Sequence, residues 1–550
     1  MSKAAAGCLL LIFLVSYSGL TQDRYFVYFK NKNSANSLYG LNDPEAFLSQ
    51  KSIGRREKQS IALDSTDLPV SPDYVARVTA KEVDAFFTSK WLNGVLVEMD
   101  SSQADTIRNL MCVDRVRLVA LGTRLRAEPE QWNPPINFSH PPYVDASTNV
   151  QLSMLGADDL AADSVLGQGV TIAVFDNGFT GVDEYEPFRG LWEESRIMET
   201  RDFVENSGNV FQYGAHGSSV FSIMAADYHF EEADFTGIAN KANFVLCVTE
   251  DAQAENTIEE YNWVMAAEFA DSLGVDIINS SLGYRDFDLQ EHDYDYEDLD
   301  GETAVISKAA RLAARKGIIV VTSSGNSGRR NEPANLINHP ADADSILTVG
   351  SVDPDFTRSS FSSIGPTADG RIKPDVCAFG NGTALVRGDG GIERGSGTSF
   401  ASPLIAGLAA AVWQKMPEKT AQEIINEIRK ASHKSANPDK FLGYGVPYYA
   451  YIINEGGKAI NIDEVIAGNI EFYPNPFTGD TLFLRSVSSP DEEVTVKVVD
   501  PLGKVVLART FLSSDFQQIL EIPLEANQQG IYYLFLQSGK DQKIVKLLNF

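Results

Sequence analysis

Apolar runs alternate with helix-like runs through the middle of the chain, between about residues 144 and 455. Five apolar runs rich in Val and Ile are predicted as strands, namely VTIAVFD, ANFVLCVT, VDIINSSLG, GIIVVTSSG and SILTVGSV. Helix-like runs such as 256–273 and 302–316 lie between them, and the isoleucines of 420–431 fall on one helical face. Strands without polar alternation are buried on both faces, as in parallel sheets covered by helices. We therefore predict an α/β domain with a doubly wound, mostly parallel sheet, spanning 144–455.

A shorter unit with another pattern lies on each side of this domain. Over residues 22–125, RYFVYFK predicts a strand, and GVLVEMDSSQADTIRNL and VDRVRLVAL predict a strand, a helix and a strand, so we expect a small α+β module. Residues 126–143 are rich in Pro, Asn and Ser, which predicts a linker. From 468 to 550, short alternating strands recur at about ten-residue intervals between turn residues, and this predicts a small all-β sandwich.

Residues 1–21 and the overall charge indicate where the chain acts. Lys3 precedes the apolar run AAAGCLLLIFLV and the small residues of SYSGLTQ, which together have the three-part pattern of a secretory signal peptide. Cleavage is expected after Thr21, with Ser18 as the alternative. The formal net charge of −29 repels phosphate backbones, so nucleic acid is not an expected partner.

Two central cysteines leave two interpretations open. The chain has only four cysteines, too few for a disulfide scaffold even in an exported protein. Cys247 and Cys377 could form one bridge, whereas the apolar context FVLCVT equally suits a buried free thiol.

Four residues at predicted strand ends or helix starts could supply acyl-transfer chemistry. His216 is flanked by glycines and opens a helix of small residues, which allows the backbone to come close to a reactive imidazole. Asp176 ends the strand VTIAVFD, where a buried carboxylate could orient that imidazole. Asn326 in SSGNSG could donate to a developing oxyanion, and Ser399 in GTSFASP begins an apolar helix. Taken singly, Asp176 and Asn326 also suit ordinary turns, so this interpretation requires a fold that brings strand ends together.

These residues carry a resemblance to a known family. The segments VFDNGF, HGSSV, SSGNSG and GTSFASP, in this order, resemble the aspartate, histidine, oxyanion-asparagine and serine motifs of the subtilisin-like serine peptidases, the subtilases of family S8. The resemblance implies a catalytic triad of Asp176, His216 and Ser399, with Asn326 in the oxyanion hole. It also implies that Ser281, Leu282 and Gly283 pair with extended peptide substrates through backbone hydrogen bonds.

The family resemblance implies a secreted serine endopeptidase that hydrolyses proteins and is made as a zymogen. Residues 22–125 occupy the place of a propeptide, which would act as an intramolecular inhibitor until a cut within 122–143. The chemistry requires no cofactor. The alternative is a catalytically silent surface binding protein or adhesin with the same fold, although all four catalytic positions are filled.

The C-terminal unit carries a second resemblance. FYPNPF, VVDPLGKVV, GIYYLFLQSG and the terminal KIVKLL resemble the sorting domain of type IX secretion cargo. This implies the type IX machinery as a partner, passage through the periplasm and outer membrane, and a secreted or cell-surface location. An accessory β-sandwich that binds carbohydrate or protein is the alternative.

An acidic segment follows the expected substrate strand. It carries nine carboxylates from Asp286 to Glu302. A solvated loop explains it most simply, but beside a cleft it could attract basic residues of a substrate or bind a structural calcium ion. Its spacing does not match an EF-hand loop, so no metal site is assigned.

Overall fold

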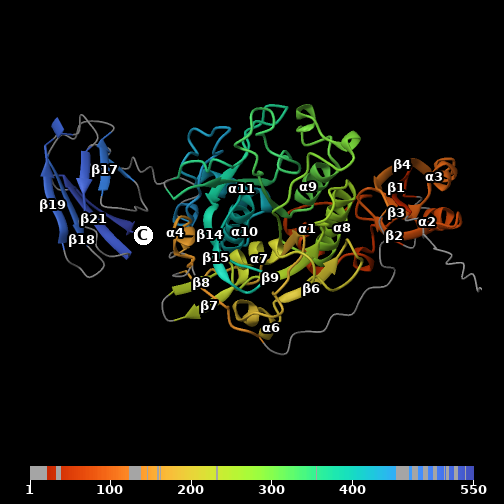
Figure 1. Cartoon of the computed structure of the whole chain (residues 1–550), viewed down its shortest axis with the longest axis horizontal. Helices are drawn as coiled ribbons and strands as arrows, with labels where there is room; N and C mark the ends of the chain where they lie inside the picture. Colours follow the sequence, from red (N-terminus) through yellow and green to blue (C-terminus); the bar gives the residue numbers. More distant parts are fainter. Residues whose placement is uncertain are drawn as a thin grey trace, which may run out of the picture.

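The computed structural model shows three units that follow one another along the chain (Figure 1). It describes residues 22–32, 39–122, 138–144, 146–157, 160, 163–230, 233–354, 356–453, 470–473, 481–486, 493–499, 505–512, 514–515, 520–524, 530–538 and 541–549. The predicted signal peptide and most of the predicted linker lie outside the described residues. Within the described part, no helix is both long enough and apolar enough to cross a membrane.

A seven-stranded sheet forms the centre of the middle unit, and every neighbouring pair in it is parallel. The strands, in spatial order, are β13 (Val376–Phe379), β12 (Leu347–Val352), β11 (Ile319–Ser323), β10 (Ile277–Ser280), β5 (Thr171–Asp176), β9 (Asn243–Val248) and β6 (Ile197–Asp202). The doubly wound parallel sheet predicted from the apolar runs is therefore confirmed. All five predicted strands are present, and β6 and β13 extend the sheet at its two edges.

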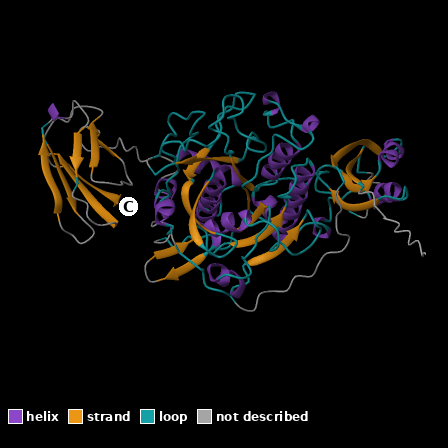
Figure 2. Cartoon of the chain, in the orientation of Figure 1, coloured by secondary structure: helices purple, strands orange, loops and turns teal. Residues whose placement is uncertain are grey.

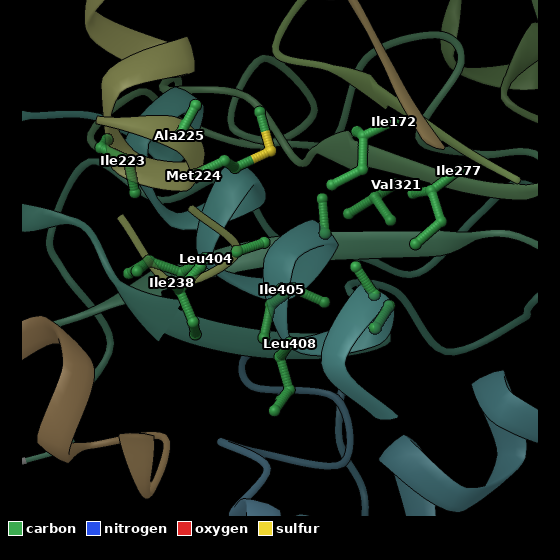
Figure 3. Packing of buried hydrophobic residues seen from close by; sticks show 14 of the residues in the cluster. Ile172, Ile223, Met224, Ala225, Ile238, Ile277, Val321, Leu404, Ile405 and Leu408 are labelled. Carbon is green, nitrogen blue, oxygen red and sulfur yellow. The ribbon is translucent and has the colours of Figure 1, made fainter. Parts of the chain in front are cut away.

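Helices cover both faces of this sheet, because alternate strand residues point to opposite sides. Ile172 and Val174 of β5 pack into one apolar core with α7 (His216–Ala225), α10 (Thr398–Lys415) and α11 (Ala421–Lys430). Figure 3 shows Leu404 and Ile405 of α10 in this core. Ala173 and Phe175 pack into a second core with α8 (Ile258–Leu273) and α9 (Val305–Arg315). The result is a three-layer arrangement of helices, sheet and helices (Figure 2).

Smaller elements complete the middle unit. They are α4 (Asn149–Ser153), η3 (Glu186–Phe188), α6 (Arg189–Glu193), the hairpin β7 (Asp227–Phe230) and β8 (Ala233–Thr236), η4 (Gln290–His292), η5 (Tyr296–Asp298), the hairpin β14 (Asn381–Val386) and β15 (Ile392–Ser396), and α12 (Tyr449–Ile453). His229 lies on β7. The strand β7 pairs antiparallel with β8, and apolar periodicity along the chain does not reveal this hairpin.

The positions of the two central cysteines decide between the two interpretations. Cys247 lies on β9 and Cys377 on β13, with four strands between them in the sheet. At a strand spacing of about 4.8 Å this separates them by roughly 24 Å, whereas a disulfide needs α-carbons within about 7 Å. Both are buried free thiols.

The N-terminal unit is a four-stranded antiparallel sheet that packs against the middle unit. Its strands are ordered β2 (Asp84–Ser89), β3 (Gly94–Met99), β1 (Asp23–Phe29) and β4 (Val113–Ala120), and its helices are η2 (Pro44–Ala46), α1 (Gln50–Lys58), α2 (Pro72–Thr79) and α3 (Ser101–Arg108). One face of this sheet packs on α8, where the Tyr28 and Tyr261 hydroxyls are 2.7 Å apart. The expected α+β module is present.

A buried charge network joins α1 to the end of α8. Asp271 accepts from Arg55 at 2.5 Å and from Arg56 at 2.8 Å, and Lys90 lies 3.4 Å away. Asp67 pairs with Arg56 and with Lys316, each at 2.8 Å. Nearby cations lower the pKa of Asp271 against the opposing effect of its burial, which is the larger single influence on the carboxyl. All of these ion pairs except Arg56–Asp67 cross from the N-terminal unit to the middle unit, and they fix how the two dock.

The C-terminal unit consists of two antiparallel sheets around one apolar core, which confirms the predicted β-sandwich. One sheet contains β16 (Ile470–Tyr473), β17 (Thr481–Ser486) and β20 (Leu520–Pro523), and the other contains β19 (Val505–Phe511), β18 (Val494–Val499), β21 (Gly530–Ser538) and β22 (Asp541–Asn549). Inward residues such as Leu484, Val496 and Leu534 are fully buried.

The network around Asp271 generates a stability prediction. In the full-length chain, Asp271→Ala should lower the free energy of unfolding by about 3–5 kcal/mol, because it leaves Arg55 buried without its carboxylate. Urea titration followed by tryptophan fluorescence measures this. Asp105→Ala removes an exposed pair with Arg108 and should change stability by less than about 1 kcal/mol. Equal effects of the two substitutions would contradict the structural role of the network.

Candidate active site

Asp176 and His216 form a hydrogen-bonded pair at the carboxyl edge of the sheet. Asp176 is the last residue of β5 and is fully buried, and its Oδ1 lies 2.8 Å from His216 Nδ1. The same oxygen accepts the backbone N–H of Asn177 at 2.8 Å, which holds the carboxylate in one orientation. Because the carboxylate accepts from Nδ1, the proton of a neutral ring sits on that nitrogen and Nε2 remains the basic one.

The absence of a side chain at position 217 allows this pair to form. A Cβ at Gly217 would overlap the carbonyl oxygen of Gly178 and lie 2.9 Å from the Cβ of Asp176. The first turn of α7 can therefore approach the end of β5 only with glycine there. The glycines around His216 that the sequence singles out thus have a steric function.

Two opposing effects set the pKa of His216. Burial is the larger influence and by itself would lower the pKa, because the imidazolium loses hydration. The charge of Asp176 and its hydrogen bond together outweigh burial, so the pKa is raised above the ordinary value of 6.5. The side chain is nevertheless 34% exposed, which leaves the ring accessible from the cleft.

Ser399 is the second residue of α10, and the packing of that helix fixes its position. Its hydroxyl donates to the carbonyl oxygen of Ser281 at 3.2 Å, and the Ser281 hydroxyl donates to the carbonyl oxygen of Ser399 at 2.9 Å. The ring of Phe400 lies 5.8 Å from the ring of His216, centroid to centroid, so the imidazole and the start of α10 are neighbours. Ser399 is 8% exposed, which makes its environment largely desolvated.

Asn326 follows β11 and is tied to the same helix start. Its Oδ1 accepts from the backbone N–H of Thr398 at 2.9 Å and from the Thr398 hydroxyl at 3.0 Å. These two bonds fix the plane of the amide, and its NH₂ group remains available to donate on the exposed side. The backbone N–H of Ser399 belongs to the first turn of α10, where the helix supplies no acceptor. The start of α10 thus fixes both donors, the side-chain amide of Asn326 and the backbone N–H of Ser399.

The segment after β10 forms one wall of a cleft. Ser281 is bonded to Ser399, Leu282 lines a cavity beside His216, and Gly283 is exposed. This cavity has a volume of about 320 Å³, and a second one of about 390 Å³ also contains His216 in its wall, together with Phe400 and residues of β15. An extended chain lying along 281–283 would cross the cleft beside the imidazole.

The structure therefore brings together every site residue that the sequence singled out. They come from β5, α7, the ends of β10 and β11, and α10. The sequence reasoning missed the loop after β9, where Glu250, Asp251 and Glu255 line the cavity beside His216. The signal was available, because EDAQAEN directly follows a predicted strand and carboxyl ends of parallel strands meet at one edge.

The carboxylates of the acidic segment at 286–302 mainly accept hydrogen bonds from backbone N–H groups of the same segment. Asp293 accepts from the N–H of Phe287, Asp298 from Asp295, and Asp300 from Glu302. Asp288 is the member of this segment that lines the cavity. In the described part of the chain, no group of three or more His, Cys, Asp or Glu side chains is arranged to hold a metal ion.

Comparison with known families agrees with this arrangement. Residues 167–445, half of the chain, match the subtilase family of S8 peptidases. The chain belongs to the subtilase family. Residues 24–133 match the peptidase S8 propeptide domain of Bacteroidota, and 471–548 match a secretion system C-terminal sorting domain. The sorting domain marks the chain for export to the cell surface or beyond.

Individual relatives are more distant. The chain is 28% identical over 302 residues to the serine protease AprX of Bacillus subtilis, covering 50% of this chain and 64% of that protein. It is 28% identical to the subtilisin-like protease SBT6.1 of Arabidopsis thaliana, covering 56% of this chain and 27% of that one, and 26% identical to subtilisin DY of Bacillus licheniformis, covering 50% and 88%. The first two matches thus span less than two thirds of those proteins. A solved structure of the MycP3 protease of a type VII secretion system aligns with a TM-score of 0.45 at 22% identity, over 60% of this chain and 95% of that one.

The raised pKa of His216 predicts a specific titration. The ring should be protonated below a midpoint above 6.5 and neutral above it. In Asp176→Asn, burial remains while the charge is lost, so the midpoint should fall below 6.5. NMR titration of the ring, assigned with His216→Gln, measures both values. A midpoint that is the same in the parent and in Asp176→Asn would show that the carboxylate does not set the pKa.

The close approach at Gly217 predicts the effect of a single methyl group. Gly217→Ala should displace the start of α7 from β5 and lower peptide hydrolysis about 100-fold, because misplacement of a catalytic group by about 1 Å has that effect. Gly190→Ala, in α6 of the same unit, where a Cβ would meet only Arg196 Nη2 at 3.9 Å, should leave hydrolysis unchanged. Full activity of Gly217→Ala would contradict the steric argument.

Proposed function

We propose that the protein is a secreted serine endopeptidase that cleaves proteins through an acyl-enzyme. The observation that supports this most strongly is the buried Asp176 carboxylate at 2.8 Å from His216 Nδ1, beside Ser399 at the start of α10. A carboxylate that holds the tautomer, an accessible basic nitrogen and a hydroxyl at a helix start are the parts that nucleophilic acyl transfer needs. Asn326 adds a donor for the negative charge that develops.

In this mechanism Ser399 is the nucleophile and His216 carries the proton. The Oγ of Ser399 attacks the carbonyl carbon of the scissile bond while His216 Nε2 takes its proton, and the oxygen that becomes negative accepts from Asn326 and from the N–H of Ser399. His216 then gives the proton to the departing amine, leaving an ester on Ser399. A water molecule, deprotonated by the same imidazole, hydrolyses that ester and restores the free hydroxyl.

Substrate binding in this proposal uses the segment that follows β10. The backbone of Ser281, Leu282 and Gly283 would pair with an extended substrate segment, so unfolded or loop regions of proteins are the preferred targets. None of the steps requires a cofactor, and a structural calcium ion is not assigned. We place the units at 1–21, 22–125, 126–143, 144–455 and 468–550, following the sequence pattern.

The N-terminal unit would serve as an intramolecular inhibitor. It is seated on α8 through an apolar face and a buried charge network, and its last strand ends near the loop after β9. A chain that continues from there could enter the cleft and block it until it is cut within 122–143. The C-terminal sandwich would engage the type IX secretion machinery, which recognises it before release or surface attachment.

Two substitutions test the proposal. Ser399→Ala should lower the kcat for a protein substrate by about 10⁶-fold, and Asn326→Ala by about 10²–10³-fold with a smaller change in KM. Ser396→Ala removes an exposed hydroxyl three residues before the nucleophile and should have no effect. The measurement is the release of peptides from casein by the processed protein.

Retention of activity by Ser399→Ala would overturn the mechanism. Absence of activity in the processed parent would instead favour a catalytically silent binding protein with the same fold.

A further inference from the structure

The cavity of about 320 Å³ beside His216 has an acidic wall that the proposed chemistry does not use. Asp176, Asn177, His216 and Leu282 form its catalytic side. The opposite side consists of residues 250–255, with the carboxyl groups of Glu250, Asp251 and Glu255, and of Asp288 from the loop after β10. Two loops from different strand ends thus bring four carboxyl groups to one hollow in the cleft.

Within the described residues these carboxyl groups have few partners. Glu250 Oε1 is buried without a hydrogen-bond partner. None of the four forms an ion pair with another described residue, and among these residues the Asp288 carboxylate accepts only from the backbone N–H of Glu255, at 3.1 Å. A buried carboxyl oxygen without a partner is unfavourable, and a hydrogen-bonded cation would relieve it.

The carboxyl groups also raise one another's proton affinity. Burial first, and then the charges of Asp288 and Asp286, raise the pKa of Glu255 to about 7. Burial first, and then the charge of Glu259, raise the pKa of Glu250 well above its usual range. A cation in the cavity would favour the charged form of both groups.

We propose that this cavity is a subsite for the cationic side chain of an arginine or lysine that precedes the scissile bond. The proposal rests on the proposed peptidase function. A substrate segment paired with 281–283 passes Leu282, which lines the cavity, whereas Ser399 and Asn326, where the scissile carbonyl would lie, do not line it. The cavity therefore receives the side chain of a substrate residue that lies on the N-terminal side of the residue whose carbonyl group is attacked.

The last strand of the N-terminal unit ends beside the acidic loop that lines this cavity. The carbonyl oxygen of Val119, at the end of β4, accepts from the hydroxyl of Thr257 at 3.2 Å. Ala120 and Arg24 line a neighbouring cavity together with Asp251 and Ala254, so the N-terminal unit already brings a cation to this acidic loop. The sequence continues after β4 as Leu-Gly-Thr-Arg-Leu-Arg, so Arg124 and Arg126 follow Ala120 by four and six positions along the chain.

A peptide that spans residues 120–130 supplies the test. Fluorescence-quenched peptides of the natural sequence, with Arg124→Gln, with Arg126→Gln and with both replaced, are compared by kcat/KM on the processed protein. The enzyme forms are the parent, Glu255→Gln, and Glu297→Gln as a matched control, since Glu297 is exposed on the acidic segment away from the cavity. All rates are divided by the number of sites titrated with a fluorophosphonate.

We expect at least one Arg→Gln peptide to lose about ten- to a hundredfold in kcat/KM on the parent, as a hydrogen bond to a charged group predicts. That loss should shrink in Glu255→Gln and persist in Glu297→Gln. Equal kcat/KM for all four peptides on a parent that titrates fully would overturn the subsite, even if Glu255→Gln failed to fold. A parent that takes up no fluorophosphonate would overturn the proposed function instead.

Discussion

The burial of α10 against the parallel sheet is the constraint on which the rest of the structure depends. The helix is apolar along nearly its whole length and contacts β10, β11, β12, β13 and α7. A helix buried in this way has little freedom to slide or rotate, because protein interiors are closely packed. Its first turn is therefore fixed at the carboxyl edge of the sheet, and Ser399 with it. Side chains from several strand ends can then converge on the first turn of α10.

The other residues of the site are linked to the first turn of α10 by short-range contacts. Asn326 is bonded to Thr398, Ser281 to Ser399, and the Phe400 ring lies beside His216. Asp176 reaches the imidazole because Gly217 leaves room for α7. The site is thus assembled from positions more than 220 residues apart by the packing of the sheet and its helices.

The same edge of the sheet explains why acidic groups meet in the cleft. The loop after β9 and the loop after β10 leave neighbouring parts of the sheet on either side of β5, so their side chains converge beside Asp176 and His216. One buried carboxylate orients the imidazole, while the others line a hollow that a substrate side chain can enter. Carboxyl groups that line one cavity therefore differ in role according to their partners.

The sequence predicted the middle unit well because its central strands are apolar on both faces, and that pattern is specific to a covered parallel sheet. The edge strand β6, with the mixed sequence IMETRD, lacks this pattern, and β13 is apolar but only four residues long, so neither was predicted. The four candidate catalytic positions were predicted from their motifs. The cavity wall at 250–255 was not, because its significance comes from two loops meeting in space and not from spacing along the chain.

The most direct test of the account is to find which residue reacts with a fluorophosphonate. The processed protein is treated with the reagent, its intact mass is measured, and the modified residue is located by peptide mapping. The account predicts one adduct per chain, on Ser399, with none in Ser399→Ala. No adduct on the processed parent, or an adduct on another residue, would contradict it.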